Sequence, residues 1–313
     1  MDVRKQSDNL KPDVRRGVAL SRLDFVPPDF VRTAWVSQDA RTAREEQLCR
    51  ISRAWEALEW RSVVEGVRRC ALRLIHLEDY VEFRSVVRTA GLDIAPMRIE
   101  EIVTSGDPSS RTMMHAAIGR KRDVKLFKEA WIEGGPDDQG SLLGYPACCC
   151  AHFNRCFVEH GFSDPTWLIA RNTAGSGAVG NALYIDASPE LNILLRSVNV
   201  RAVPHLPCRF DCEPSLEFAR RFLDLARHTG YAKEAEELWE MLAWPVEFSV
   251  LHGIAEIRTP VMKIVTKTDA TGAKYAIRWI GRAYPLDGAR GLVFPYNHCR
   301  PAKKPASESA APR

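Results

Sequence analysis

Six of the nine cysteines in this chain lie in two short segments, residues 148–156 and 208–212. An odd number of cysteines cannot all pair within one chain, and such clusters are typical of metal binding or thiol chemistry rather than of a disulfide framework. The two segments have to meet in space if they form one site. This meeting is the first constraint on the fold.

A proline places the first segment at the start of a predicted helix. Pro146 suits the first helical position, because its missing N–H would have had no partner there, and we expect a helix from Pro146 to about His160. Its first turn carries Cys148 and Cys149, close to the free amide groups and the positive end of the helix dipole, which stabilise thiolates. Thiolate is the form of cysteine that binds metals.

The second segment follows the same pattern. Pro214 marks the start of a helix that is expected to end by Gly230. Cys212 is expected just before this helix, and Cys208 in the loop that leads into it. The two pairs of thiols would then face one another across a shared pocket, and we predict a metal site formed by Cys148, Cys149, Cys208 and Cys212.

The identity of the metal is less constrained by the sequence. Four thiolates are the usual ligands of an iron–sulfur cluster or of a tetrahedral zinc ion, and the spacing from Cys208 to Cys212 fits zinc. Adjacent helical side chains such as Cys148 and Cys149 diverge by about 100°, which disfavours a single small ion and favours a cluster of several irons. We therefore predict a [4Fe–4S] cluster, with zinc as the alternative and metal-free core cysteines as a third interpretation.

Three neighbouring residues leave the ligand set open. Cys150 and Cys156 are expected to be structural. However, Cys148, His152 and Cys156 share one helix face at positions i, i+4 and i+8. A mixed ligand set that includes His152 is therefore an alternative, although a single histidine is more often a hydrogen-bonded structural residue.

The two motifs resemble the signature of a family of prokaryotic proteins of unassigned function. That signature is an LLGYPxCC segment with an aromatic residue four positions on, followed later by HxPCxxxC; here these are residues 142–149 with Phe153, and residues 205–212. The resemblance covers roughly residues 112 to 230 and implies no reaction. The third consecutive cysteine departs from the signature and lets the ligand set shift by one residue. The resemblance implies that Cys150 and Cys156 are additions and that the functional set is Cys148, Cys149, Cys208 and Cys212.

Two polar residues near the second motif are candidates for proton transfer. His205 is chosen because histidine titrates near neutral pH, and Glu213 because a carboxylate beside a cationic centre accepts protons. The leading functional prediction is an iron–sulfur-cluster enzyme of unknown substrate with His205 and Glu213 as catalytic residues. The alternatives are a zinc-stabilised binding or scaffold protein without catalysis, and metal-free thiol catalysis with Cys148 as the nucleophile.

The charge of the chain gives no reason to expect nucleic acid as an obligate partner. Its 44 basic and 40 acidic side chains give a formal net charge of +4, and Lys303, Lys304 and Arg313 near the end account for much of this excess. The N-terminal residues lack the apolar run of a signal peptide, and no stretch approaches the roughly 18 apolar residues of a membrane span. We expect a cytoplasmic protein without a membrane partner.

The patterns along the chain predict an α+β fold with a helical N-terminal region, a central mixed α/β core that carries the cysteines, and a small C-terminal β-hairpin or sheet. Apolar residues keep helical spacing from Leu48 to Val81, residues 93–104 and 112–118 suit short strands, and residues 123–131 and 232–243 suit helices. Residues 254–268 and 274–280 are expected to pair through a turn at 269–272. The predicted units are an irregular leader (1–36), a helical region (37–104), the cysteine-bearing core (105–245), a β-rich closing segment (246–299) and a disordered tail (300–313).

Overall fold

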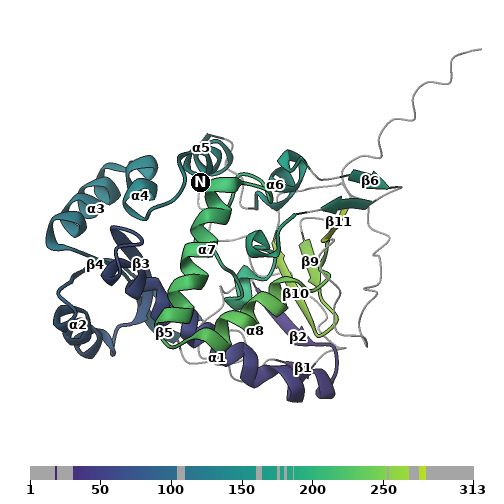
Figure 1. Ribbon diagram of the computed structural model, residues 1–313, viewed down its shortest axis with the longest axis horizontal. Coiled ribbons are helices and arrows are strands. Elements are labelled where there is room, and N and C mark those ends of the chain that lie inside the picture. Colours follow the sequence, from purple (N-terminus) through teal and green to yellow (C-terminus); the bar gives the residue numbers. More distant parts are fainter. Residues whose placement is uncertain are drawn as a thin grey trace, which may run out of the picture.

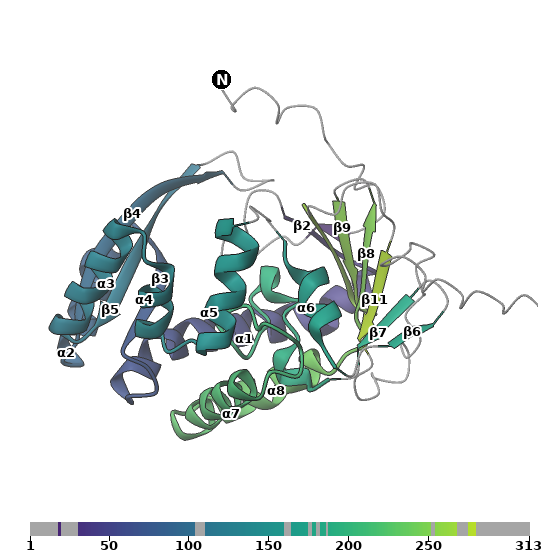
Figure 2. The same ribbon diagram turned by 90° about the horizontal axis from the view of Figure 1, so that it is seen from above.

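A computed structural model of the chain describes residues 18–19, 31–103, 110–159, 164–174, 177–179, 182–185, 187–251, 254–267 and 275–279. The predicted α+β class is confirmed, because helices pack with two separate sheets. Figure 2 shows the smaller sheet at one end, the larger sheet at the other, and most of the helices between them. The predicted tail (300–313), the predicted turn (269–272) and most of the predicted leader lie outside the described residues.

The helical region predicted near the N-terminus contains a strand. Helix α1 (Gln38–Val64) begins after Ser37, whose hydroxyl accepts the N–H of Ala40, and α2 (Tyr80–Thr89) follows later. Between them, β3 (Cys70–His76) is extended, so the helical spacing read through Leu74 was wrong there. The reason is that successive side chains of this segment point to opposite faces, as in a strand. Ala71 and Ile75 pack on the side of α1 and α2, while Cys70 and Leu72 pack against α3.

The smaller sheet has the order β3-β5-β4 and is antiparallel throughout. Strands β4 (Asp93–Val103) and β5 (Ser110–Gly119) confirm the two predicted short strands, and α3 (Lys121–Glu133) confirms the helix predicted after them. Strand β3 lies at an edge of this sheet, which leaves one side of its backbone without a partner strand among the described residues.

Among the described residues the larger sheet has eight strands, and it extends well beyond the predicted small hairpin. Residues Arg32–Trp35 form strand β2, which pairs with β10, so an irregular leader was the wrong expectation for this stretch. Its strands, in sheet order, are β1 (Val18–Ala19), β2, β10 (Met262–Lys267), β9 (Ile254–Arg258), β8 (Glu247–Leu251), β11 (Tyr275–Trp279), β7 (Ala182–Ile185) and β6 (Gly177–Val179).

The strand pairing predicted for residues 254–280 was also wrong. Strands β9 and β10 pair with each other across a tight turn closed by the Thr259 N–H and the Met262 carbonyl. Strand β11 pairs with β8 and β7 instead of with β10. Pro260 explains the difference, because a residue without an N–H interrupts a strand and favours a turn.

The remaining helices lie between the two sheets. The helices predicted after Pro146, after Pro214 and over residues 232–243 are all confirmed within a few residues. None of the described helices is both long enough and apolar enough to cross a membrane. In chain order the helices after α3 are α4 (Pro136–Leu142), α5 (Ala147–Phe153) with its π-helical continuation Asn154–Glu159, α6 (Thr166–Asn172), α7 (Glu213–His228) and α8 (Ala232–Leu242).

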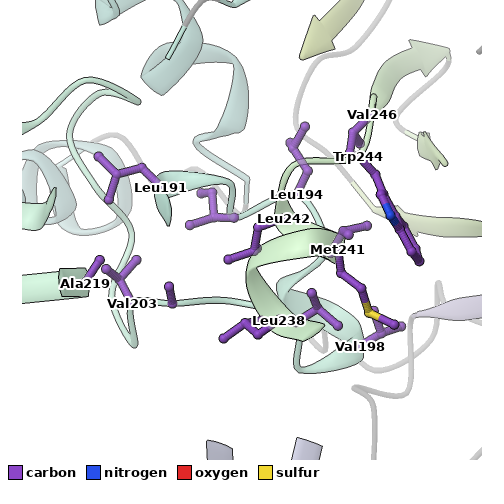
Figure 3. Close-up of a cluster of buried hydrophobic side chains, with 14 of the residues drawn as sticks. Leu191, Leu194, Val198, Val203, Ala219, Leu238, Met241, Leu242, Trp244 and Val246 are labelled. Atoms are coloured by element: carbon purple, nitrogen blue, oxygen red, sulfur yellow. The ribbon is translucent and has the colours of Figure 1, made fainter. Parts of the chain in front are cut away.

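The main hydrophobic core lies where α1, α7 and α8 meet the segment 191–203. Trp55 of α1 packs on Phe222 of α7 with ring centroids 4.7 Å apart. The polar side chain of Asn192 is buried in this core, where its amide donates to the carbonyl of Leu242. Figure 3 shows part of this core, with Leu191, Leu194, Val198, Val203, Ala219, Leu238, Met241, Leu242, Trp244 and Val246.

A buried ion pair joins the end of α1 to the turn before β3. The Arg68 guanidinium is fully buried and contacts the carboxylate of Glu59 and the hydroxyl of Ser62, the latter at 2.6 Å. Its central carbon, Cζ, lies over the ring of Phe222 on α7, 5.7 Å from the ring centroid. The carbons of Arg68 also form the wall against which Gly144 packs, so this ion pair supports the turn that leads into α5.

Gly144 is restricted in two ways. Its backbone has φ +75°, a conformation that residues with a Cβ atom rarely adopt. A Cβ at this position would also lie 2.9 Å from the Cβ of Arg68. Gly66 offers a matched control, because it has φ +69° but open space around it.

We expect Gly144→Ala to cost more than Gly66→Ala in free energy of unfolding, measured by urea denaturation. The left-handed backbone costs about 1 to 2 kcal/mol at both positions. The close contact with Arg68 adds about 1 to 3 kcal/mol at Gly144 alone. Equal losses in the two variants would contradict the packing argument.

We expect Glu59→Gln to lower the free energy of unfolding by about 3 to 5 kcal/mol, because it leaves the Arg68 cation buried without a full countercharge. Glu46→Gln is the control in the same helix, since Glu46 pairs with Arg50 but is largely exposed, and its loss should stay below about 1 kcal/mol. Urea denaturation of both variants measures the difference. Similar losses would show that the buried pair has no special role.

Candidate metal centre

The sulfur atoms of Cys148, Cys149, Cys208 and Cys212 all lie within 4.8 Å of one another. The structure therefore brings together the four residues predicted from the sequence. Together they form a group that can hold a metal ion, and we call this group the four-cysteine site. Figure 1 shows helix α5, which carries the first pair, beside the start of α7, which follows the second pair.

The first pair is placed by the start of α5. The carbonyl of Pro146 accepts the N–H groups of Cys149 and Cys150 at 2.9 and 3.0 Å, which closes the first turn. Cys148 and Cys149 belong to that turn, as predicted. Since Pro146 itself has no N–H, the turn forms without leaving a donor unpaired at this position.

The second pair is placed by the start of α7. Cys212 caps this helix, and its carbonyl accepts the N–H groups of Ser215 and Leu216 at 3.0 Å. Cys208 lies in the preceding loop, four residues earlier, as predicted. The N-terminal end of a 16-residue helix therefore lies at the site, where its dipole favours negatively charged sulfur.

Three of the sulfur atoms are nearly equidistant. The sulfur of Cys212 lies 3.7 Å from that of Cys148 and 3.7 Å from that of Cys149, and the latter two are 3.9 Å apart. Adjacent Cys148 and Cys149 were expected to diverge too far to converge on one small ion, yet their sulfur atoms lie almost as close to each other as each lies to that of Cys212.

The site lies at the protein surface with one side open. Cys149 and Cys212 have exposed fractions of 2% and 1%, whereas Cys208 is partly buried and Cys148 is exposed. Two sulfur atoms are thus shielded from water, and Cys148 is the one on the solvent side.

Hydrogen bonds reach the buried sulfur of Cys149 from two sides. The backbone N–H of Cys208 donates to it at 3.4 Å, and the hydroxyl of Ser215 lies 3.2 Å away. The same hydroxyl is 2.8 Å from Nε2 of His205. A chain of contacts therefore runs from His205 through Ser215 to Cys149.

The environment of His205 fixes which atom donates in each of these two hydrogen bonds. The ring is buried between Tyr145 and Phe218, and burial lowers its pKa to about 4, so it is neutral near pH 7. Its Nδ1 has no hydrogen-bond partner among the described residues. A proton on Nε2 avoids a buried N–H without an acceptor, so Nε2 donates to Ser215 and the Ser215 hydroxyl donates to the sulfur of Cys149. That direction suits a thiolate.

Protons on the four sulfur atoms are coupled. Hydrogen bonds with Cys149 and Cys208 hold the pKa of Cys212 well below its ordinary value. The pKa of Cys149 is raised by its hydrogen bonds with Cys208 and Cys212 and by burial. Adjacent thiolates repel one another, so ionising all four thiols requires a cation among them. A soft divalent ion or an iron–sulfur cluster meets this requirement.

Cys150, Cys156 and His152 lie apart from the four-cysteine site. The thiol of Cys150 is directed to the carbonyl of Tyr145 at 3.9 Å. Cys156 and His152 contact each other, with 3.5 Å between Sγ and Nε2, in the buried part of the helix. The structural role expected for Cys150 and Cys156 agrees with these contacts, and the mixed set with His152 is not the one that the structure brings together.

The two predicted catalytic residues occupy different surroundings. His205 is buried and reaches Cys149 through Ser215. Glu213 follows Cys212 but its side chain is 70% exposed and pairs with Arg220 at 3.2 Å. A role of Glu213 in proton transfer stays a prediction. Sequence reasoning missed Ser215, although it stands three residues after Cys212, a spacing that puts two side chains on the same helix face.

Comparison of the chain with protein-family models, with curated proteins and with solved structures finds no match.

Exposure predicts which of these thiols reacts first. In protein that has been reduced and treated with a chelator, we expect iodoacetamide to modify Cys148 about tenfold faster than Cys149 or Cys212, because alkylation needs an accessible sulfur. Mass spectrometry of peptides from a time course measures the three rates. Earlier modification of Cys149 or Cys212 would contradict the burial of these two residues.

Proposed function

We propose that the four-cysteine site binds a single zinc ion in tetrahedral geometry. The separation of the sulfur atoms carries this proposal. A zinc–sulfur bond of about 2.3 Å in a tetrahedron puts neighbouring sulfur atoms about 3.8 Å apart. The three separations of 3.7 to 3.9 Å among Cys148, Cys149 and Cys212 agree with this value.

The surroundings of the site also suit a tetrathiolate centre. Four thiolates around a dication carry a net negative charge, which the amide of Cys208, the hydroxyl of Ser215 and the start of α7 stabilise. When bound, zinc would be coordinated by all four cysteines and would cross-link the start of α5 to the start of α7. The protein would then be a zinc-stabilised binding or scaffold protein, in which Cys148, Cys149, Cys208 and Cys212 are the ligands.

An iron–sulfur enzyme is the second candidate. A [4Fe–4S] cluster holds each cysteine on a different iron and so spreads the sulfur atoms more widely than one ion does. The exposure of Cys148 favours this candidate nevertheless, because an exposed ligand can turn outward and leave an iron open to a substrate. His205 and Glu213 keep their proposed roles in proton transfer only in this case.

The resemblance to the family with the LLGYPxCC and HxPCxxxC motifs enters the proposal in one respect. It supports the same four ligands and adds no reaction. The proposed family relationship implies that other members bind the same metal through the equivalent cysteines.

Metal analysis separates the two candidates. The protein is purified without oxygen, and zinc, iron and acid-labile sulfide are measured per chain together with an absorption spectrum. We expect a single zinc per chain and no colour, and the loss of zinc in Cys149→Ser and in Cys212→Ser.

Cys150→Ser is the matched control, because Cys150 follows directly in the same helix but its thiol is directed to Tyr145. This variant should keep its zinc. Brown protein with iron and sulfide would overturn the zinc proposal in favour of the cluster. Protein without either metal, or equal loss of metal in Cys150→Ser, would overturn the assignment of the four ligands.

A further inference from the structure

A cleft of about 610 Å³ lies between the smaller sheet and the segment 194–201. Its walls include Trp55, Glu56 and Glu59 of α1, the strand β3 and the start of α2, and none of the described cysteines lines it. The volume is within the range of small-molecule binding sites. The cleft is therefore a second candidate site, distinct from the four-cysteine site.

Strand β3 turns its free backbone edge toward this cleft. Five consecutive residues, 72–76, line the cavity, and side chains from both faces of a strand share one cavity only where its edge faces that cavity. Just after β3, the N–H of Leu77 donates to the carbonyl of Thr112 on β5. Since bonding alternates along an antiparallel pair, the backbone groups of Leu72, Leu74 and His76 point away from β5. The carbonyl of His76 already accepts the N–H of Asp79, so the groups of Leu72 and Leu74 are the ones that offer donors and acceptors to a ligand.

Two arginines in the cleft are already paired. Arg73 contacts Glu56 at 3.2 Å, and Arg196 contacts Asp164 at 3.4 Å. Each guanidinium therefore has a carboxylate of its own, and these four charges balance.

The third arginine is incompletely satisfied. Arg201 approaches Glu59 only at 3.7 Å, and the same carboxylate is already bound by the buried Arg68. Two guanidinium groups thus share one carboxylate, so Arg201 has no carboxylate of its own. The fourth acidic residue of the lining, Asp79, is exposed. The central guanidinium carbon of Arg201 lies over the ring of Trp55, 5.5 Å from the ring centroid.

Two buried donors of the cleft have no partner within the described residues. They are Nε of Arg201 and the hydroxyl of Ser197, from the same segment of chain. Buried polar groups are nearly always hydrogen-bonded, and the planar fork of an arginine matches the oxygens of carboxylate and phosphate. The two unmet donors, one of them on a cationic guanidinium that shares its carboxylate, favour an oxyanion.

The rest of the lining is largely apolar. Such walls suit the hydrocarbon or aromatic body of a ligand whose charged group is bound elsewhere. The apolar residues that line the cleft include Leu72, Phe83, Met113, Leu194, Leu206 and Ile257.

We propose that this cleft binds a small amphipathic molecule that carries a carboxylate or phosphate group. Arg201 and Ser197 bind the anionic group, the free edge of β3 hydrogen-bonds to polar atoms of the body, and the apolar walls cover the remainder. The proposal rests on the cleft alone and holds whichever metal the four-cysteine site binds.

Three probes that share an eight-carbon chain but differ in their head group test the proposal. Octanoate, octyl phosphate and octanol are titrated into the metal-loaded full-length protein by isothermal titration calorimetry. We expect one or both anions to bind at a single site and octanol to bind about tenfold more weakly or worse, because charged hydrogen bonds are lost. The two anions distinguish a carboxylate from a phosphate ligand. Equal binding of octanol, or no binding of either anion at millimolar concentration, would overturn the proposal.

Variants locate the anionic group. Arg201→Gln and Ser197→Ala should each weaken the tighter anion, the former about tenfold or more, while Arg227→Gln should not. Arg227 is a charge-matched control, since it is exposed on α7 and pairs with Asp224 outside the cleft. Circular dichroism checks that each variant is folded, and Ser197→Ala carries the test if Arg201→Gln does not fold. Unchanged affinity in folded variants, or an equal loss in Arg227→Gln, would overturn the assignment.

Discussion

The buried ion pair between Arg68 and Glu59 is the interaction on which the arrangement of the helices most depends. A fully buried guanidinium is tolerated only with a carboxylate and further hydrogen bonds around it, and these come from Glu59 and Ser62 at the end of α1. Phe222 covers its face from α7. Movement of α1, of the turn before β3 or of α7 would separate the charge from its partners, so these three elements are held together.

Both candidate sites rest on this pair from different sides. Gly144 packs on the carbons of Arg68, and Tyr145, the next residue, covers the ring of His205 beside the four-cysteine site. Glu59 also attracts Arg201, which places that guanidinium in the cleft with an unmet donor. One carboxylate that serves two arginines therefore stabilises the core and leaves Arg201 incompletely paired in the cleft.

Local rules predicted the elements that depend on nearby residues. Pro146 and Pro214 marked the two helix starts, because the effect of proline on a helix is confined to its first turn. The rules failed at β3, where the positions of Leu74 and its apolar neighbours also fitted a helix, and at β11, whose partners β8 and β7 are distant in sequence. Sheet partners are chosen by packing, and a spacing pattern does not contain them.

The sequence by itself determined which cysteines stand at helix starts, and so which thiols were candidates for a metal. Only the tertiary structure decided that sulfur atoms 64 residues apart in the chain lie 3.7 Å from each other, that Ser215 and His205 extend the site, and that a cleft opens beside β3. The physical reason is one of range. Helix starts follow from backbone preferences over a few residues, whereas distances between segments follow from how buried side chains fill the space between them.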